Sequence, residues 1–314
     1  MNLRQLEAFQ EVMVSGSVSA AARTLGRSQP AVSALISTLE ESVGCALFER
    51  RGGRLHPLPE AHFLFEESRD IPERIERLRL TMRGAPEGAR HTLRIASMPG
   101  PAMFYLPDVI SRFSESHPDV RFVLNSRVST SVRQLVANQS CDIGLVDLGI
   151  EDSDLDKPLI DITPMTFNCV CALRDDEPLA ALSEITPADL DGHPMALLLP
   201  SHMTNRQCRK AFHDAGATLN ARYQTETFIP HLRLIEGGNL CSILDPMTAE
   251  AYGIMTRRGG AVIFRPFIPD IKMEVAILTA TFAPPSGLAR EFLDMFMVRL
   301  AETTERFSNG FIPG

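Results

Sequence analysis

Polar side chains gather at the start of a predicted helix near residue 30. Ser28, Gln29 and Ser33 surround Pro30 in the segment RSQPAVS. A glutamine amide can make two hydrogen bonds to adenine, and serine hydroxyls bond bases or phosphates. Pro30 is tolerated there because first-turn amides need no intrahelical partner. We expect these four residues to read DNA in the major groove, although such a helical pattern alone also suits a protein-interaction module.

Three arginines flank a Gly-Gly pair in the segment LFERRGGRLHPLP. The glycines between two short apolar runs predict a β-hairpin, which would form a wing beside the helices. Guanidinium groups on such a wing bond phosphates and add affinity with little sequence reading. We therefore expect Arg50, Arg51 and Arg54 to contact the DNA backbone.

Hydroxyl, acidic and apolar side chains follow several predicted strands in the rest of the chain. Ligands in open α/β sheets bind beyond the carboxyl ends of strands, where helix amides and hydroxyls also suit a carboxylate. Simple helix capping explains the same Ser and Thr positions equally well, and Asp245 could instead cap a helix that starts at Pro246. The candidate ligand-binding residues are Ser97, Met98, Ser129, Thr130, Asp147, His202, Phe228 and Asp245.

Motifs for catalysis and for metal binding are absent from the sequence. There is no GxSxG, HExxH or glycine-rich phosphate loop, and the eight histidines are scattered. The six cysteines form no CxxC pair, which argues against zinc. We expect no enzyme activity, cofactor or metal, and buried thiols in a reducing compartment. A redox sensor that uses Cys208 or the Cys169/Cys171 pair is the alternative.

Short helices account for most of residues 1–58. Apolar residues recur every three or four positions from Leu3 to Met13, as on one face of a helix. Ser17 and Ser28 are placed to cap two further helices, and Gly44 ends the last of them. Two short helices and a hairpin predict a winged helix-turn-helix, with Val32 on its buried face.

Residues 59–90 read as a linker. Leu64, Ile71, Ile75, Leu78 and Met82 form a seam like that of a coiled coil, so we expect a dimerisation helix rather than an ordinary surface helix. A proline at position 72 should kink or divide this helix. The aperiodic segment RGAPEGARH then predicts a hinge.

From residue 91 the pattern changes to strands that alternate with amphipathic helices, which indicates parallel sheets covered by helices. Residues 91–304 are too many for one sheet, so we expect two lobes around a cleft. We assign 91–164 and 269–304 to lobe one and 165–268 to lobe two. The fold class is α/β, and the two lobe crossings are expected near 162–166 and 267–271.

Composition and charge agree with this division. The chain has 314 residues and a net charge of −8, yet residues 1–90 hold 12 arginines, no lysine and 12 acidic residues. Residues 1–90 are therefore neutral, with arginine as their only basic residue apart from histidine, and the rest of the chain is acidic. This distribution is compatible with an N-terminal part that binds DNA and a C-terminal part that does not. No apolar run reaches the roughly 20 residues of a membrane span, and no secretion signal is evident. We expect a cytoplasmic protein with no membrane association.

Residues 3–61 resemble, without a gap, the DNA-binding domain of LysR-type transcriptional regulators. The motifs that carry the resemblance are LRQLEAF, GSVSAAARTLGRSQPAVS, LE and LFER, and later RIASMPG, LVANQSCDIGLVD and EGGNLCSILDP. The family implies homodimers through the linker helix, usually assembled into tetramers. It also implies a domain resembling periplasmic binding proteins, which switches transcription as a small-molecule effector fills its cleft. Contact with RNA polymerase is a further implied partnership.

Two features distinguish this sequence within the family. Ala34 and Leu35 occupy positions where many members carry polar or basic residues. Recognition of the DNA sequence should therefore depend more on Gln29, Ser33 and the wing. The segments LDPMTAEAYG and VIFRPFIPDIKMEVAIL are similar to regulators of lysine biosynthesis and opine catabolism, which suggests an amino-acid-like effector. A two-lobed solute-binding protein is the remaining alternative, and the DNA-binding segment argues against it.

Overall fold

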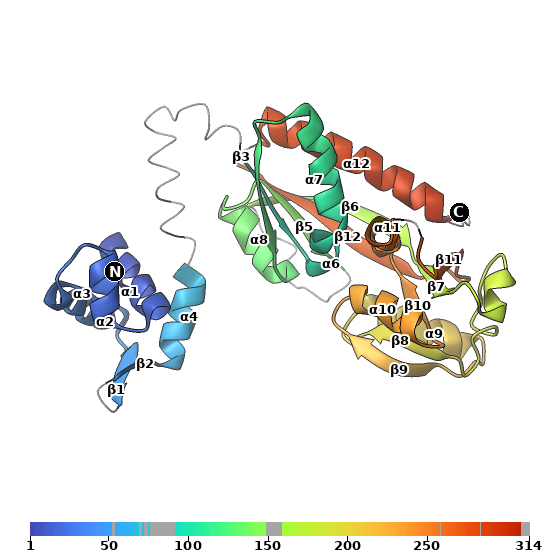
Figure 1. Ribbon diagram of the computed structural model, residues 1–314, viewed down its shortest axis with the longest axis horizontal. Helices are drawn as coiled ribbons and strands as arrows, with labels where there is room; N and C mark the ends of the chain where they lie inside the picture. Colours follow the sequence, from blue (N-terminus) through green and yellow to red (C-terminus); the bar gives the residue numbers. More distant parts are fainter. Residues whose placement is uncertain are drawn as a thin grey trace. The chain divides into compact units, whose positions relative to one another are not determined.

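The chain forms two compact units, Met1–Arg90 and His91–Gly314 (Figure 1). The computed structural model describes residues 1–51, 54–68, 71, 75, 92–148, 159–257, 259–282 and 284–308. None of the helices within these ranges is long and apolar enough to cross a membrane.

Three helices with local caps begin the smaller unit. They are α1 (Leu3–Ser15), α2 (Val18–Thr24) and α3 (Gln29–Val43). The hydroxyls of Ser17 and Ser28 accept hydrogen bonds from the amides of Ala20 and Ala31, as capping residues do. Gly44 ends α3 at a φ of 79°, a left-handed conformation that glycine adopts without steric cost. The expected helices and caps are confirmed.

A hairpin and a fourth helix complete the described part of this unit. Strands β1 (Phe48–Arg51) and β2 (Arg54–Pro57) pair antiparallel, and α4 (Pro59–Ser68) follows. Phe9, Val32, Ile36 and Leu39 are buried together in the core of the three helices. The expected winged helix-turn-helix is therefore present.

The predicted linker helix is described only in part. Its first turns form α4, and Leu64 packs against the core of the smaller unit. Ile71 and Ile75 are helical, whereas Pro72, the rest of the apolar seam and the expected hinge lie outside the described residues.

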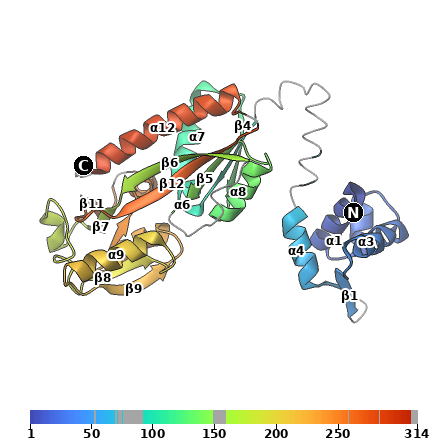
Figure 2. The same cartoon turned by 180° about the vertical axis from the view of Figure 1, so that it is seen from behind.

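The larger unit contains two five-stranded sheets (Figures 1 and 2). The first has the order β4-β3-β5-β12-β6 and comprises Thr92–Ser97 (β3), Arg121–Ser126 (β4), Ile143–Asp147 (β5), Ile160–Asn168 (β6) and Lys272–Ala280 (β12). The second has the order β11-β7-β10-β8-β9 and comprises Val170–Arg174 (β7), Pro194–Leu198 (β8), Asn220–Thr225 (β9), Cys241–Leu244 (β10) and Val262–Pro266 (β11).

Each sheet has four strands that run in one direction and a single strand that runs against them, so the expected parallel sheets are present with one reversed strand in each. β3 is parallel to β4 and β5, and β8 is parallel to β9 and β10. The four remaining strands, β6, β7, β11 and β12, carry the chain between the lobes. β7 and β12 enter their sheets from the cleft side and run against the other four strands, whereas β6 and β11 end at the cleft and run with them.

The first crossing lies later in the chain than 162–166. β6 pairs with β12 as far as the partners Asn168 and Lys272, so the first sheet retains residues 165–168. The chain enters the second sheet at Val170 and returns between Pro266 and Lys272. Lobe one therefore extends to Asn168, because the paired strands stay in register beyond the expected boundary.

Helices cover both faces of the sheets. In the first lobe α7 (Tyr105–Ser116) and α12 (Gly287–Ser308) contact each other, and α8 (Ser129–Ala137) packs against β3, β5 and β12. The short α6 (Pro99–Met103) follows β3, and α9 (Met203–Asp214), α10 (Ile229–Gly237) and the 3-10 turn η2 (Pro178–Ala181) belong to the second lobe.

One helix of the second lobe packs against the first. α11 (Pro246–Met255) connects β10 to β11, yet it contacts α6, α7 and α12. The long α12 in turn contacts α7 and also β11, so it extends along both lobes (Figure 2). These two helices join the lobes beside the crossing strands.

Candidate functional site

The start of α3 presents polar groups that are free of the core. Gln29 and Pro30 are exposed in its first turn, and Ser33 is half-buried one turn further on. Ser28 is exposed too, but its hydroxyl caps the helix by accepting the Ala31 amide at 3.4 Å. The first turn of α3 can therefore offer an amide and hydroxyls to base edges.

The wing is attached to α3 by a carboxylate. Oε1 of Glu40 accepts hydrogen bonds from the amides of Leu47 at 2.7 Å and Phe48 at 3.1 Å. On β1, the exposed Arg51 forms an ion pair with Glu49 at 2.8 Å. The backbones of Arg50 and Arg54 belong to the hairpin, and their side chains lie outside the described residues.

A cavity of about 270 Å³ lies where the parallel strands of both lobes end. Met98, Ser129 and Asp147 follow or end β3, β4 and β5 of the first sheet. Leu199 and Asp245 follow β8 and β10 of the second. The carboxyl ends of parallel strands thus meet in one place, as expected for a ligand site in α/β folds.

The structure brings six of the eight ligand-binding candidates to this cavity. Those that line it are Met98, Ser129, Asp147, His202, Phe228 and Asp245. Ser97 is fully buried and its hydroxyl donates to the carbonyl of Met98 at 2.9 Å, so it supports the wall from behind. Thr130 is exposed in the first turn of α8 and does not line the cavity. Ser97 and Thr130 are each next in sequence to a residue that does line the cavity, Met98 and Ser129, but they do not line it themselves.

A hydrogen bond between His202 and Asp147 connects the two lobes across the cavity. Nδ1 of His202 accepts the Thr204 amide at 3.2 Å and so caps α9. Nε2 therefore carries the ring proton and donates it to Oδ2 of Asp147. The amide of Asp147 in turn donates to Oγ of Ser129 at 3.0 Å, which ties β5 to the start of α8.

Asp245 performs the capping role that was the alternative interpretation. Its two oxygens accept hydrogen bonds from the amide and the hydroxyl of Thr248 at 3.0 and 2.6 Å. Burial nevertheless raises the pKa of Asp245, because the charged form loses hydration inside the protein. Asp245 thus contributes to the cavity wall while it holds the start of α11.

Acidic groups dominate the charge of the cavity. Among the described lining residues, Asp147, Glu226 and Asp245 carry carboxylates, and none is a lysine or an arginine. The sequence-based candidates missed Glu226, which directly follows β9. The same rule, that ligands meet the carboxyl ends of strands, would have found it. An acidic wall favours a ligand with a positive charge.

The cysteines do not support redox sensing. Cys141, Cys169, Cys171, Cys208 and Cys241 are buried, and Cys45 is exposed. Burial raises the pKa of Cys208 to about 12 and that of Cys169 well above its ordinary value. Peroxide reacts with thiolates, and a raised pKa keeps both thiols protonated, so neither is activated for oxidation. Within the described ranges, His, Cys, Asp and Glu side chains form no cluster of three that could hold a metal.

The chain combines a winged helix-turn-helix with a two-lobed domain that has a cavity at its strand ends. This combination is that of a DNA-binding regulator controlled by an effector. Two family models match this chain. One describes a bacterial regulatory helix-turn-helix protein of the lysR family and matches residues 3–62. The other describes the LysR substrate binding domain and matches residues 86–301. The chain belongs to the LysR family of transcription regulators and is not an enzyme.

Relatives support this assignment over nearly the whole length. The regulatory protein NocR of Agrobacterium tumefaciens is 33% identical over 92% of this chain and 93% of its own. The octopine catabolism/uptake operon regulatory protein OccR of Rhizobium meliloti is 33% identical over 61% of this chain and 63% of its own. The fold matches the crystal structure of full-length CbnR complexed with its target DNA, with a TM-score of 0.67, 20% identity and coverage of 96% and 100%.

Proposed function

We propose that the cleft of this regulator binds an opine-type derivative of a basic amino acid, which carries a guanidinium or ammonium group. The observation that carries the proposal is the set of three carboxylates, without lysine or arginine, among the described residues of the cavity wall. A guanidinium or ammonium group bonds such carboxylates through charge-assisted hydrogen bonds. The likeness to OccR, whose name refers to octopine catabolism, supports the same ligand class.

The carboxylate of such an effector has a separate place in the cleft. α8 begins at Ser129 without a side-chain cap, in contrast to α9 and α11, which His202 and Asp245 cap. The first amides of an uncapped helix attract anions. The effector would therefore span from the start of α8 in lobe one to the acidic groups of both lobes. All eight residues predicted from the sequence are candidates to test by mutation.

The effector acts by shifting the balance between two lobe arrangements. Asp147 and His202 belong to different lobes, so a cation that binds Asp147 competes with the hydrogen bond from His202. A ligand moves such an equilibrium only by its difference in affinity for the two states, typically about 1–3 kcal/mol. The arrangement of the lobes would then set the spacing of paired DNA-binding heads and hence the half-sites they occupy.

The oligomeric state, partners and cellular location that we propose are those that the family implies. Residues 1–58 would bind DNA, residues 59–90 would dimerise through the linker helix, and residues 91–304 would bind the effector. We propose a homotetramer that works in the cytoplasm, where its DNA is, and that contacts RNA polymerase when it activates.

Titration calorimetry of the full-length protein tests the ligand class. Octopine and arginine should bind saturably, whereas benzoate and succinate should not. Asp147→Asn should weaken octopine binding by about 1.5–3 kcal/mol, because it removes a charged hydrogen-bond partner. The matched control Asp214→Asn removes an exposed carboxylate paired with Lys210 outside the cavity and should leave binding unchanged. Saturable binding of benzoate alone would contradict an effector that carries a cationic group.

A further inference from the structure

A second cavity lies at the opposite end of α11 from the effector cleft. Thr248 in the first turn of this helix lines the cleft, whereas Gly253 and Ile254 near its end line the second cavity. The second cavity has a volume of about 260 Å³ and lies where α7, α11 and α12 meet.

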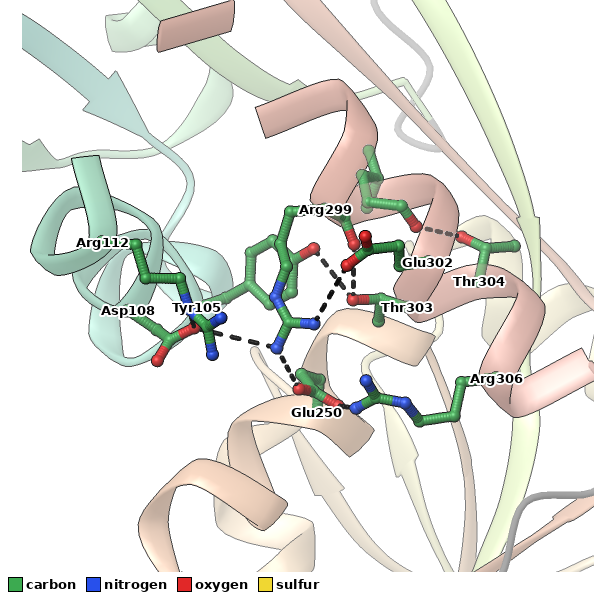
Figure 3. A network of polar contacts seen from close by, with 10 residues as sticks. Tyr105, Asp108, Arg112, Glu250, Arg299, Glu302, Thr303, Thr304 and Arg306 are labelled. Atoms are coloured by element: carbon green, nitrogen blue, oxygen red, sulfur yellow. Dashed lines mark hydrogen bonds and ion pairs between the residues drawn. The ribbon is translucent and has the colours of Figure 1, made fainter. Parts of the chain in front are cut away.

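Arginines from three segments form its walls. Arg112 lies on α7, Arg299 on α12 and Arg257 just beyond α11. Figure 3 shows the side chains of Arg112 and Arg299, from two different helices, pointing toward each other near Asp108 and Glu250. Positive charge is thus concentrated at a point where both lobes contribute to the wall.

The two carboxylates of the wall are already engaged. Glu250, which is buried, binds both Arg299 and Arg306, the latter at 2.5 Å (Figure 3). Asp108 accepts a hydrogen bond from Arg112 at 3.0 Å and also lies 3.8 Å from Arg299. These carboxylates therefore have little capacity left to neutralise a further guanidinium.

Donor capacity remains on the arginines. Arg257 is exposed and has no ion-pair partner among the described residues. Arg299 is only 7% exposed, and its Nε has no hydrogen-bond partner within the described part of the chain. Three guanidiniums and two carboxylates line the wall. With Glu302, which lies 3.6 Å from Arg299, and Arg306, which pairs with Glu250, four guanidiniums face three carboxylates, so one positive charge remains (Figure 3).

We propose that this cavity is a second ligand site, which binds a small oxyanion through Arg257, Arg112 and Arg299. The planar fork of a guanidinium matches the oxygens of phosphate and of carboxylates alike. An anion held there would bridge α7 of the first lobe and α11 of the second. It would also contact the helix whose first turn lines the effector cleft.

Titration calorimetry of the full-length protein with inorganic phosphate, and separately with succinate, tests the site. Ionic strength is held constant with chloride, because screening alone changes charged interactions. At least one anion should bind saturably, and Arg257→Gln should weaken it at least tenfold. Because Arg257 is exposed and outside the buried ion pairs, the thermal unfolding of this variant in chloride should match that of the parent.

The matched control is Arg290→Gln, which removes an exposed guanidinium on α12 outside the cavity wall and should leave binding unchanged. Phosphate binding alone identifies a phosphate site, succinate binding alone identifies a carboxylate site, and binding of both identifies a general oxyanion site. The proposal is overturned if neither anion binds saturably. It is equally overturned if Arg257→Gln binds like the parent or if both variants weaken binding alike, since the anion would then lie elsewhere.

Discussion

The proposed DNA-reading residues all lie within one short segment, 28–33, whereas the proposed effector cleft takes its walls from segments spread between Met98 and Met273. The first depends on one capped helix and the second on the register of two sheets. A substitution in the reading segment should therefore change DNA binding and leave the free energy of unfolding nearly unchanged. A substitution among the contacts that hold the larger unit together should do the reverse.

The largest expected effect is on stability. Glu250→Ala should lower the free energy of unfolding by about 3–5 kcal/mol, because it leaves the buried guanidinium of Arg299 without its main partner. Urea unfolding of the full-length protein measures this change. Asp214→Ala, which breaks an exposed pair with Lys210, should cost less than about 1 kcal/mol. Equal losses in the two variants would show that the buried ion pairs do not hold the larger unit together.

A second stability effect concerns pH and the interior of the second lobe. The fully buried ring of His231 bonds Oγ1 of Thr225 and Oγ of Ser242, each at 2.7 Å, and burial lowers its pKa from 6.5 to about 4. The unfolded chain thus binds one more proton between these pH values. The free energy of unfolding should fall as pH drops from 6.5 to 4, by about 3 kcal/mol from this group alone.

Urea unfolding across this pH range, with His231→Gln compared with the parent, isolates the contribution of the histidine. Other titrating groups affect both proteins, so only the difference between the two slopes reports on His231. Parallel slopes would show that the folded protein protonates this ring as readily as the unfolded chain does.

The next effect tests the reading surface. Gln29→Ala should cost about 1–3 kcal/mol of discrimination between operator and unrelated DNA, because we propose that its exposed amide bonds a base edge. Competition binding measures this ratio. Since Gln29 is exposed, the free energy of unfolding should change by less than about 0.5 kcal/mol. A loss of stability without a loss of discrimination would remove the contrast between the two regions.

The smallest effect is expected at the wing. Arg51→Ala should weaken binding to operator and unrelated DNA alike and reduce the salt dependence by about one phosphate contact. The ion pair with Glu49 already offsets part of the arginine's charge, so the loss should be modest. Binding measured over a range of salt concentrations checks this, and a selective loss on operator DNA would place Arg51 among the reading residues.

Many residues of the proposed effector cleft were predicted by one rule, that ligands bind at the carboxyl ends of strands. That rule led to Met98, Ser129 and Asp147, which line the cavity, and it would also have led to Glu226. It failed for Ser97 because the direction of a side chain at a strand end depends on the pleat and on neighbouring strands. The rule locates the edge of a sheet, and packing selects which side chains face the ligand.

Features that depend only on near neighbours could be predicted from local sequence. Ser17, Ser28 and Gly44 set the helix ends, because caps and left-handed glycines act within a few residues. Contacts between distant segments became visible only in the folded chain. Arg299 and Glu250 are 49 residues apart, and His202 and Asp147 are 55 apart. Such pairs depend on sheet register and helix packing, and no local pattern encodes where two distant segments meet.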